Sequence, residues 1–159
     1  RRRAGAFAYP TASTEIGERA TAAELAALLT GFEAVAFSAA THHGARVIKT
    51  IGDEVMLAAD EPARACRAAL DIVRRCVADG RLPAARGGVA AGDVLDQDGA
   101  CHGPAVNRAA RFVQAAADGS VMVDEAVVAA LPDDLVVEER PPVAHRGLGE
   151  RRWWAVRPV

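Results

Sequence analysis

The most informative segment of the chain is Arg46-Val47-Ile48-Lys49-Thr50-Ile51-Gly52-Asp53-Glu54-Val55-Met56, because it reads as two short apolar strands joined by a glycine turn. Lys49 and Asp53 lie four residues apart around that turn. A carboxylate at such a reversal can hold a hard cation such as Mg²⁺. A Gly-Asp turn beside a lysine is also ordinary in surface hairpins, so the neighbouring motifs decide between the two interpretations. The stretch predicts a hairpin that faces a nucleotide.

The composition limits the classes of protein to consider. With 159 residues, 51% of them hydrophobic, the chain is long enough for one domain with a core, and we expect residues 1–159 to form a single domain. Nineteen basic and 21 acidic residues leave a net charge of −2, which argues against nucleic acid or an anionic membrane as the main partner. Any nucleotide site must therefore be local.

The chain's location and extent give further expectations. No apolar run approaches the roughly 20 residues that span a bilayer, and no signal peptide opens the chain, so we expect a cytoplasmic domain without membrane contact. The first residues, Arg1-Arg2-Arg3, include no methionine. We expect a domain cut from a longer polypeptide that carries attached regulatory domains.

The cysteines predict no disulfide framework or metal site. Cys66, Cys76 and Cys101 show no C-x-x-C spacing. Cys66 and Cys76 fall on one predicted helix about 15 Å apart along its axis, which is too far for a disulfide. We expect reduced thiols that pack in the core.

Periodicity and turn signals predict an alternation of strands and helices. A strand over Ala4–Tyr9 ends at Pro10, a capping box over Thr21–Glu24 opens a helix to about Ala40, and Gly44 ends it. A second helix begins at Glu61. We expect its apolar stripe to be formed by Cys66, Ala69, Leu70, Val73, Cys76 and Val77. We expect its solvent-exposed face to carry Arg64, Arg67, Asp71, Arg74 and Arg75.

The second half continues the alternation. The predicted elements are a strand over 86–95, a turn over 96–99, a helix opened by Gly103-Pro104, a strand over 120–124, a short helix over 125–131, and strands over 135–139 and 151–156. The order predicts an α+β fold with a ferredoxin-like βαββαβ core, C-terminal additions and a mostly antiparallel central sheet flanked by helices.

A second set of polar residues lies on the helix after Pro104. Its predicted buried stripe includes Val106 and Val113, whereas Asn107 and Arg111 sit at i and i+4 on another face. An amide and a guanidinium side by side can hold a ribose oxygen and a phosphate. The alternative is an exposed pair on an ordinary amphipathic helix. Arg108 is expected to point elsewhere, into solvent.

With these motifs in order, the chain resembles the catalytic domain of class III adenylate and guanylate cyclases. Residues 7–14 stand where that family has its first strand and phosphate loop, and residues 47–56 match its K-x-x-G-D-x-x-M hairpin. Residues 86–94 match its R-x-G-x-x-x-G-[ED]-V strand, and residues 98–111 match its D-G-D-x-x-G-x-x-V-N-x-A-A-R helix entry. The resemblance covers most of the chain.

The resemblance implies a head-to-tail homodimer or heterodimer with active sites at the interface. In that family one subunit supplies two metal-binding aspartates and its partner supplies an asparagine and an arginine. Two Mg²⁺ or Mn²⁺ ions activate the ribose 3′-hydroxyl of ATP, or of another purine nucleotide, for attack on the α-phosphate, which releases pyrophosphate.

By matching position, the resemblance assigns a role to five residues of this chain. Asp53 is the second metal ligand, and Lys49 is the base-selecting lysine, which favours ATP. Asn107 orients the ribose and Arg111 stabilises the phosphate. Arg146 lies near the place of a lysine that binds the triphosphate, although a plain loop arginine is the alternative.

Tyr9 departs from the family pattern, because it stands where the family has its first metal-binding aspartate. A phenol stays neutral at pH 7 and cannot replace a carboxylate that bridges two divalent ions. We expect the loss of transition-state stabilisation to be on the order of several kcal/mol.

Ala100 is a second departure, since many relatives have there an aspartate that accepts a hydrogen bond from the adenine amino group. A methyl group cannot accept one, so discrimination between adenine and guanine should weaken. The loop Pro10–Ser13 also lacks the small-residue and glycine run that is usual for the phosphate loop.

Other residues carry weaker hypotheses. His42-His43 precede Gly44, where a helix C-terminal cap is favoured over a metal site. His102 lies next to the nucleotide-facing loop. Trp153 and Trp154 should face opposite sides of a strand, one toward the core and the other toward a dimer contact.

Several functions remain open from the sequence. One is a pseudo-cyclase, a dimerising regulatory module in cyclic-nucleotide signalling with weak or lost catalysis. A second is an active Mn²⁺-dependent adenylate cyclase with relaxed base selectivity, and a third is one half of a heterodimeric cyclase. The diguanylate cyclase fold shares a Gly-Asp-Glu hairpin, but its G-G-D-E-F run is absent here.

Overall fold

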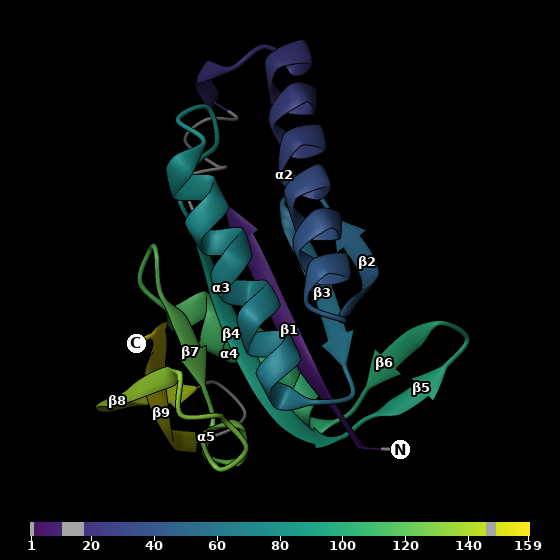
Figure 1. Ribbon diagram of the computed structural model, residues 1–159. Coiled ribbons are helices and arrows are strands. Elements are labelled where there is room, and N and C mark those ends of the chain that lie inside the picture. The colour runs from purple at the N-terminus through teal and green to yellow at the C-terminus, as the bar shows by residue number, and fades with distance from the viewer. Residues whose placement is uncertain (1, 11–17, 146–148) are drawn as a thin grey trace.

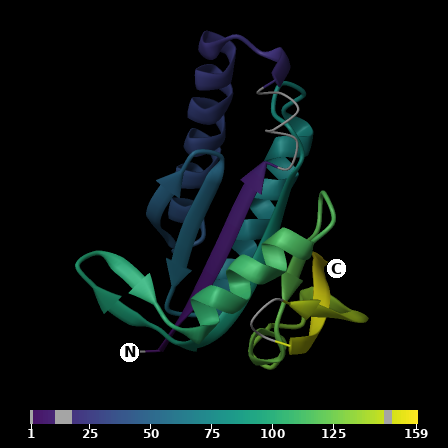
Figure 2. The same ribbon diagram turned by 180° about the vertical axis from the view of Figure 1, so that it is seen from behind.

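A seven-stranded sheet in the order β2-β3-β1-β4-β7-β9-β8 forms the centre of the computed structural model. The structure describes residues 2–10, 18–145 and 149–159, with the backbone alone for 2–10, Asp96 and His145. Neighbouring strands are antiparallel, except for the parallel pair of β4 and β7. Helices α2 and α3 cover one face of the sheet and α4 covers the other (Figures 1 and 2). The prediction of an α+β fold with a mostly antiparallel sheet is confirmed.

The elements follow the predicted order with one addition. Their bounds are β1 Arg2–Pro10, α2 Ala22–His42, β2 Arg46–Ile51, β3 Glu54–Ala59, α3 Pro62–Ala78, β4 Ala85–Asp93, β5 Leu95–Gln97, β6 Ala100–His102, α4 Pro104–Ala115, β7 Val121–Val123, α5 Glu125–Val128, β8 Leu135–His145 and β9 Gly149–Pro158.

The addition is a two-stranded hairpin, β5–β6, that projects from the body of the domain (Figure 2). From the sequence, only a turn over residues 96–99 is expected here. Asp98 and Gly99 both have positive φ angles, 52° and 78°, as tight hairpin turns require. The Asp-Gly pair was therefore an available hairpin signal that the prediction did not use.

The start of α2 confirms the predicted capping box. The backbone N–H of Glu24 donates to Thr21 Oγ1 at 3.1 Å, and the backbone N–H of Thr21 donates to Glu24 Oε2 at 3.3 Å. These bonds satisfy two amides that a helix N-terminus otherwise leaves without partners. At the other end the chain leaves the helix through His43 and Gly44, whose φ is 70°.

Helix α2 is long and apolar enough, by length and composition, to cross a membrane. This differs from the expectation that no apolar run approaches the length that spans a bilayer. Only 17% of its most apolar window is buried inside the domain, and Phe37 is half exposed. The N-terminal half extends beyond the sheet (Figure 1), whereas Phe32, Ala36 and Ala39 of the C-terminal half are fully buried in the core shared with α3. That buried half is a core helix of this domain.

The core has two layers, one on each face of the sheet. Trp154 belongs to the layer under α2 and α3, whereas Trp153 packs against Phe112 of α4, with ring centroids 5.7 Å apart. Both tryptophans are buried within the chain, so the expectation that one reaches a dimer contact is wrong. The three cysteines are free and buried, as predicted.

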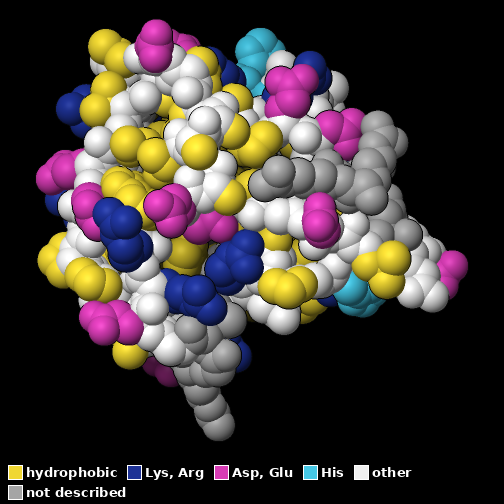
Figure 3. Space-filling view, turned by 90° about the horizontal axis from the view of Figure 1, so that it is seen from below, with side chains coloured by type: hydrophobic (Ala, Val, Ile, Leu, Met, Phe, Trp, Pro, Cys, Tyr) yellow, Lys and Arg dark blue, Asp and Glu magenta, His cyan; other side chains and the backbone are white. Residues whose placement is uncertain are grey.

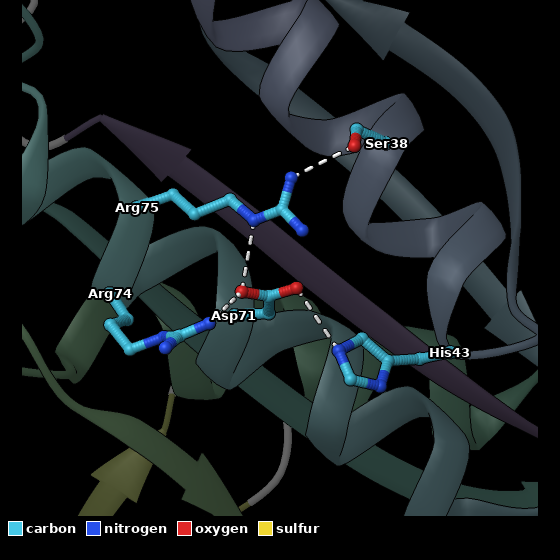
Figure 4. A network of polar contacts seen from close by, with 5 residues as sticks. All are labelled: Ser38, His43, Asp71, Arg74 and Arg75. Atoms are coloured by element: carbon cyan, nitrogen blue, oxygen red, sulfur yellow. Dashed lines mark hydrogen bonds and ion pairs between the residues drawn. The ribbon is translucent and has the colours of Figure 1, made fainter.

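Asp71 contradicts the predicted exposed face of α3, because its side chain is only 4% exposed. Its carboxylate accepts hydrogen bonds from Arg74 Nη2 at 2.8 Å and Arg75 Nε at 3.0 Å, and it lies 3.1 Å from His43 Nε2 (Figure 4). Arg75 also donates to Ser38 Oγ of α2 at 2.8 Å. The network joins the end of α2 to α3, and it explains how an ionised carboxylate is tolerated there. Val77, predicted in the apolar stripe, is instead 68% exposed.

Helix α4 packs unusually closely on strand β4. A Cβ atom added at Gly88 would lie 2.4 Å from the carbonyl oxygen of Ala109 and 2.7 Å from the amide nitrogen of Val113. A Cβ added at Gly92 would lie 3.2 Å from Ala105 Cβ. The two glycines therefore set the distance between α4 and the sheet.

We predict that Asp71→Asn lowers the free energy of unfolding by about 2 kcal/mol at pH 7, because three donors lose a charged acceptor. Burial of Asp71 opposes its ionisation, but the bonds from Arg74, Arg75 and His43 outweigh it and lower its pKa from 3.8 to about 2. The stabilisation is therefore complete above pH 4 and is lost as the pH falls toward 2. Urea unfolding across this range measures it.

The control is Glu138→Gln, which removes an exposed ion pair with Arg140 and should change stability by less than about 1 kcal/mol. Equal stabilities for Asp71→Asn and the wild type at pH 7 would contradict the assigned role of the network.

We predict that Gly88→Ala lowers the free energy of unfolding by about 2 kcal/mol, because the methyl group forces α4 away from β4. The matched control is Gly80→Ala, since a Cβ at Gly80 meets nothing within 4 Å. Thermal unfolding compares the two variants. If Gly88→Ala is as stable as Gly80→Ala, the close contact does not constrain the helix.

Candidate nucleotide site

The hairpin predicted from the sequence is formed by β2 and β3. Gly52 makes the turn with a φ of 56°, a conformation that glycine adopts without strain. The Lys49 side chain is exposed, and Asp53 is half-buried beside the turn. Thr50 Oγ1 donates to Glu33 Oε1 of α2 at 3.3 Å. The hairpin is thus tied to α2 and presents its lysine to solvent.

Glu54 is a half-buried carboxylate next to Asp53 that the predicted site did not include. Burial raises the pKa of its carboxyl, the neighbouring Asp53 carboxylate raises it further, and Lys49 lowers it. These three charges therefore lie within electrostatic reach of one another. The signal was available in the sequence, since Glu54 directly follows Asp53.

Tyr9 lies at the end of the central strand β1. Its backbone pairs with Arg86 of β4, and the preceding residue, Ala8, pairs with Val55 of β3. Position 9 is therefore next to the hairpin that carries Asp53. A carboxylate at position 9 could share a cation with Asp53, whereas the phenol of tyrosine cannot supply an anionic bridge at neutral pH.

A pair of divalent ions does not fit the residues present. Within residues 18–145 and 149–159, no three His, Cys, Asp or Glu side chains gather into a set that could hold a metal. Asp53 can contribute one carboxylate to a single Mg²⁺ or Mn²⁺ ion. The bridge between two ions has no donor at position 9.

Asn107 and Arg111 lie on α4, on the opposite face of the sheet from α2 and α3. Asn107 is exposed, and Arg111 is half-buried with one hydrogen bond, from Nη1 to Gln114 Oε1 at 3.3 Å. Among the described residues, neither side chain bonds to Lys49 or Asp53. One copy of the chain thus carries two separate polar groups.

Ala100 begins β6 and is half-buried, paired with Gln97 across the projecting hairpin. His102 is exposed on the same strand and pairs with Leu95. The methyl group of Ala100 offers no hydrogen-bond acceptor. Arg146 and the loop residues 11–13 lie outside the described residues.

Arg108 corrects the expectation that it points into solvent. Its side chain is 23% exposed, and its Nε donates to Asp124 Oδ2 at 3.2 Å. The prediction failed because the acceptor, Asp124, lies 16 residues further along the chain. His43, by contrast, caps α2 as expected and also contacts Asp71.

Two hollows lie outside this set of residues. A groove of about 650 Å³ between α3 and the ends of β8 and β9 has apolar walls with arginines at its margin, and none of the predicted site residues lines it. A second hollow of about 410 Å³ is lined by Arg108, Asp124 and the start of β9. Figure 3 shows hydrophobic side chains interspersed with arginines and acidic residues on one face of the molecule. Neither hollow contains Lys49, Asp53, Asn107 or Arg111.

Sequence comparison finds similar proteins that are named adenylate cyclases. An adenylate cyclase from Glutamicibacter nicotianae is 35% identical over 150 residues, which cover 93% of this chain and 37% of that protein. An adenylate cyclase from Streptomyces coelicolor is 36% identical over 126 residues, covering 79% of this chain and 33% of that protein. No family model matches the chain. The chain spans about a third of the length of these relatives.

Solved structures share the fold. The guanylate cyclase domain of RhGC from Catenaria anguillulae, in complex with GTP, superposes with a TM-score of 0.87 at 21% identity and covers 99% of this chain and 96% of its own. The adenylyl cyclase CyaB from P. aeruginosa gives a TM-score of 0.81 at 18% identity over 99% and 94%. The β2–β3 hairpin, strand β4 and helix α4 lie where the resemblance predicts them. The chain belongs to the class III adenylate and guanylate cyclase catalytic domains.

Proposed function

We propose that this chain is an adenylate cyclase-type domain with weak or lost turnover of ATP to cyclic AMP and pyrophosphate. It acts in the cytoplasm as a dimerising, regulatory module in cyclic-nucleotide signalling. The observation that carries the proposal is the tyrosine at position 9, at the end of β1 and beside the Asp53 hairpin. The intact hairpin and Asn-Arg helix support retained nucleotide recognition.

Each of the predicted site residues has a role in this proposal. Lys49, exposed on β2, donates to a ring nitrogen of the purine and favours ATP. Asn107 orients the ribose, and Arg111 offers a fork of N–H donors to a phosphate oxygen. A bound Mg²⁺ or Mn²⁺ ion at Asp53 would lower the charge of the phosphates. Arg146 remains a candidate contact to the triphosphate.

Base selectivity is the weakest part of the recognition. The Ala100 methyl group cannot accept from the adenine amino group, so a guanine nucleotide leaves no additional protein group unpaired. The proposal therefore includes another purine nucleotide as a possible ligand, bound with little discrimination.

Two observations support a dimer. Asn107 and Arg111 make no bond to the hairpin groups within one chain, so a complete site needs these residues from a second copy or from a related cyclase domain. The β5–β6 hairpin projects from the body with Leu95 61% exposed. Cys101 of β6 is buried against the domain, and a partner seated on the other side of the hairpin would cover Leu95.

A second candidate function is the supply of Asn107 and Arg111 to a partner that keeps both aspartates. The exposure of Asn107 favours it, since no described contact of this chain occupies that side chain. In such a heterodimer Tyr9 would not limit the site that the partner's two aspartates form with Asn107 and Arg111 of this chain. An active Mn²⁺-dependent homodimer is the remaining alternative.

We predict that Tyr9→Asp raises cyclic AMP formation by the purified chain at least about 10-fold with Mn²⁺. A factor of 10 corresponds to about 1.4 kcal/mol of transition-state stabilisation, and a restored carboxylate should supply at least that much. The assay measures cyclic AMP and cyclic GMP with Mg²⁺ and with Mn²⁺. Tyr9→Asp with Ala100→Asp should further favour ATP over GTP.

The controls are Tyr9→Phe, which removes the hydroxyl without adding charge, and Arg111→Ala in the Tyr9→Asp chain, which should abolish the gain. A wild-type chain that turns over ATP as fast as Tyr9→Asp refutes the loss of catalysis.

A further inference from the structure

We propose that Arg108 is a positioning residue that fixes the N-terminal half of α4 and thereby aims Asn107. The inference rests on the proposed function for the role of Asn107, and it deepens that function by naming what holds this residue in place. Arg108 itself faces away from the nucleotide groups and acts through the helix.

The guanidinium of Arg108 joins three elements. Its Nε donates to Asp124 Oδ2 at 3.2 Å, and its Nη2 donates to the carbonyl oxygen of Ala91 in β4 at 3.2 Å. Asp124 is itself held, since its Oδ1 accepts from the backbone N–H of Val127 at 3.0 Å and its own N–H donates to the carbonyl of Val89 at 3.3 Å. The side chains of Arg108 and Asp124 are only 23% and 10% exposed, which limits competition from water.

The other contacts of this half of α4 are apolar, since Ala105 and Ala109 are buried in the core layer under the helix. Ala105 lies over Gly92 and the backbone of Ala109 lies over Gly88, and Arg108 Nη2 would be 3.3 Å from a Cβ atom added at Gly92. The N-cap residue is Gly103, which has no side chain that could cap the helix, and the first turn contains no acidic residue. The aromatic lock between Phe112 and Trp153 lies one turn further on.

Asn107 depends on this half of the helix. It is exposed, and no hydrogen bond to its side chain exists among the described residues, so the direction of the amide follows the helix backbone. Arg108 is its immediate neighbour. A displacement of about 1 Å in a group that contacts substrate is enough to lower a rate about 100-fold.

An arginine is needed at this position because its two bonds diverge. Nε and Nη2 belong to one planar fork, and they reach a side chain and a backbone carbonyl at once. A lysine has one nitrogen on a flexible stem, so it can retain the charge pair with Asp124 but holds the carbonyl less well. The series arginine, lysine, glutamine should therefore be graded.

The test combines amide hydrogen exchange with kinetics. Exchange is measured by NMR on the otherwise wild-type chain carrying Arg108→Gln, Arg108→Lys or Asp124→Asn, with Arg140→Gln as a matched control at an exposed ion pair. We expect amides 107–111 to exchange at least 10-fold faster in Arg108→Gln, less so in Arg108→Lys, and unchanged in Arg140→Gln. Amides of β1 and β3 should remain unaffected.

The kinetic arm uses the same substitutions in the Tyr9→Asp chain. Arg108→Gln should lower kcat at least 10-fold with KM changed less than about 3-fold, and Arg108→Lys should recover part of the loss. If Tyr9→Asp is inactive, the proposed function fails, and the exchange data still decide the positioning role. Unchanged exchange at 107–111, or faster exchange spread equally over the whole domain, overturns the inference.

Discussion

The close contact between helix α4 and strand β4 is the constraint on which the arrangement of this domain depends. Gly88 leaves no room for a side chain, because a Cβ there would lie 2.4 Å from a carbonyl oxygen of the helix. The contact sets the distance of α4 from the sheet, and Asn107 and Arg111 lie on that helix. The same sheet carries the Lys49 and Asp53 hairpin, which β1 separates from β4. One backbone contact thus relates both polar groups to a common frame.

Much of the fold could be predicted because its signals are local. The capping box at Thr21, the glycine turn at Gly52 and the proline that opens α4 each act within a few residues. The environment of Asp71 could not be predicted this way, since its partners include His43 from the preceding helix. The prediction that Arg108 points into solvent failed for the same reason, because Asp124 comes close to it only when β7 pairs with β4. Charged residues on an amphipathic helix look solvent-exposed until the fold supplies distant partners.

The site was predicted in its parts but not in its assembly. The structure places the predicted residues of the hairpin and of α4 on the expected elements, and their chemical roles stay predictions. Glu54 was overlooked, although burial and Asp53 together raise its pKa. Position 9 lies at the end of β1, next to the hairpin that carries Asp53, and it holds a tyrosine where the resemblance implies a carboxylate. The domain has the fold of a class III cyclase catalytic domain, and it carries a tyrosine where the resemblance places a metal-binding aspartate.

We infer that the tyrosine at position 9 limits the domain to one metal ion, and a count of bound ions tests this inference. Mn²⁺ binding is measured by electron paramagnetic resonance in the presence of a non-reactive ATP analogue, for the wild-type chain and for Tyr9→Asp. The account predicts no more than one Mn²⁺ ion per nucleotide in the wild type and two in Tyr9→Asp. Two tightly bound ions in the wild-type chain would contradict it.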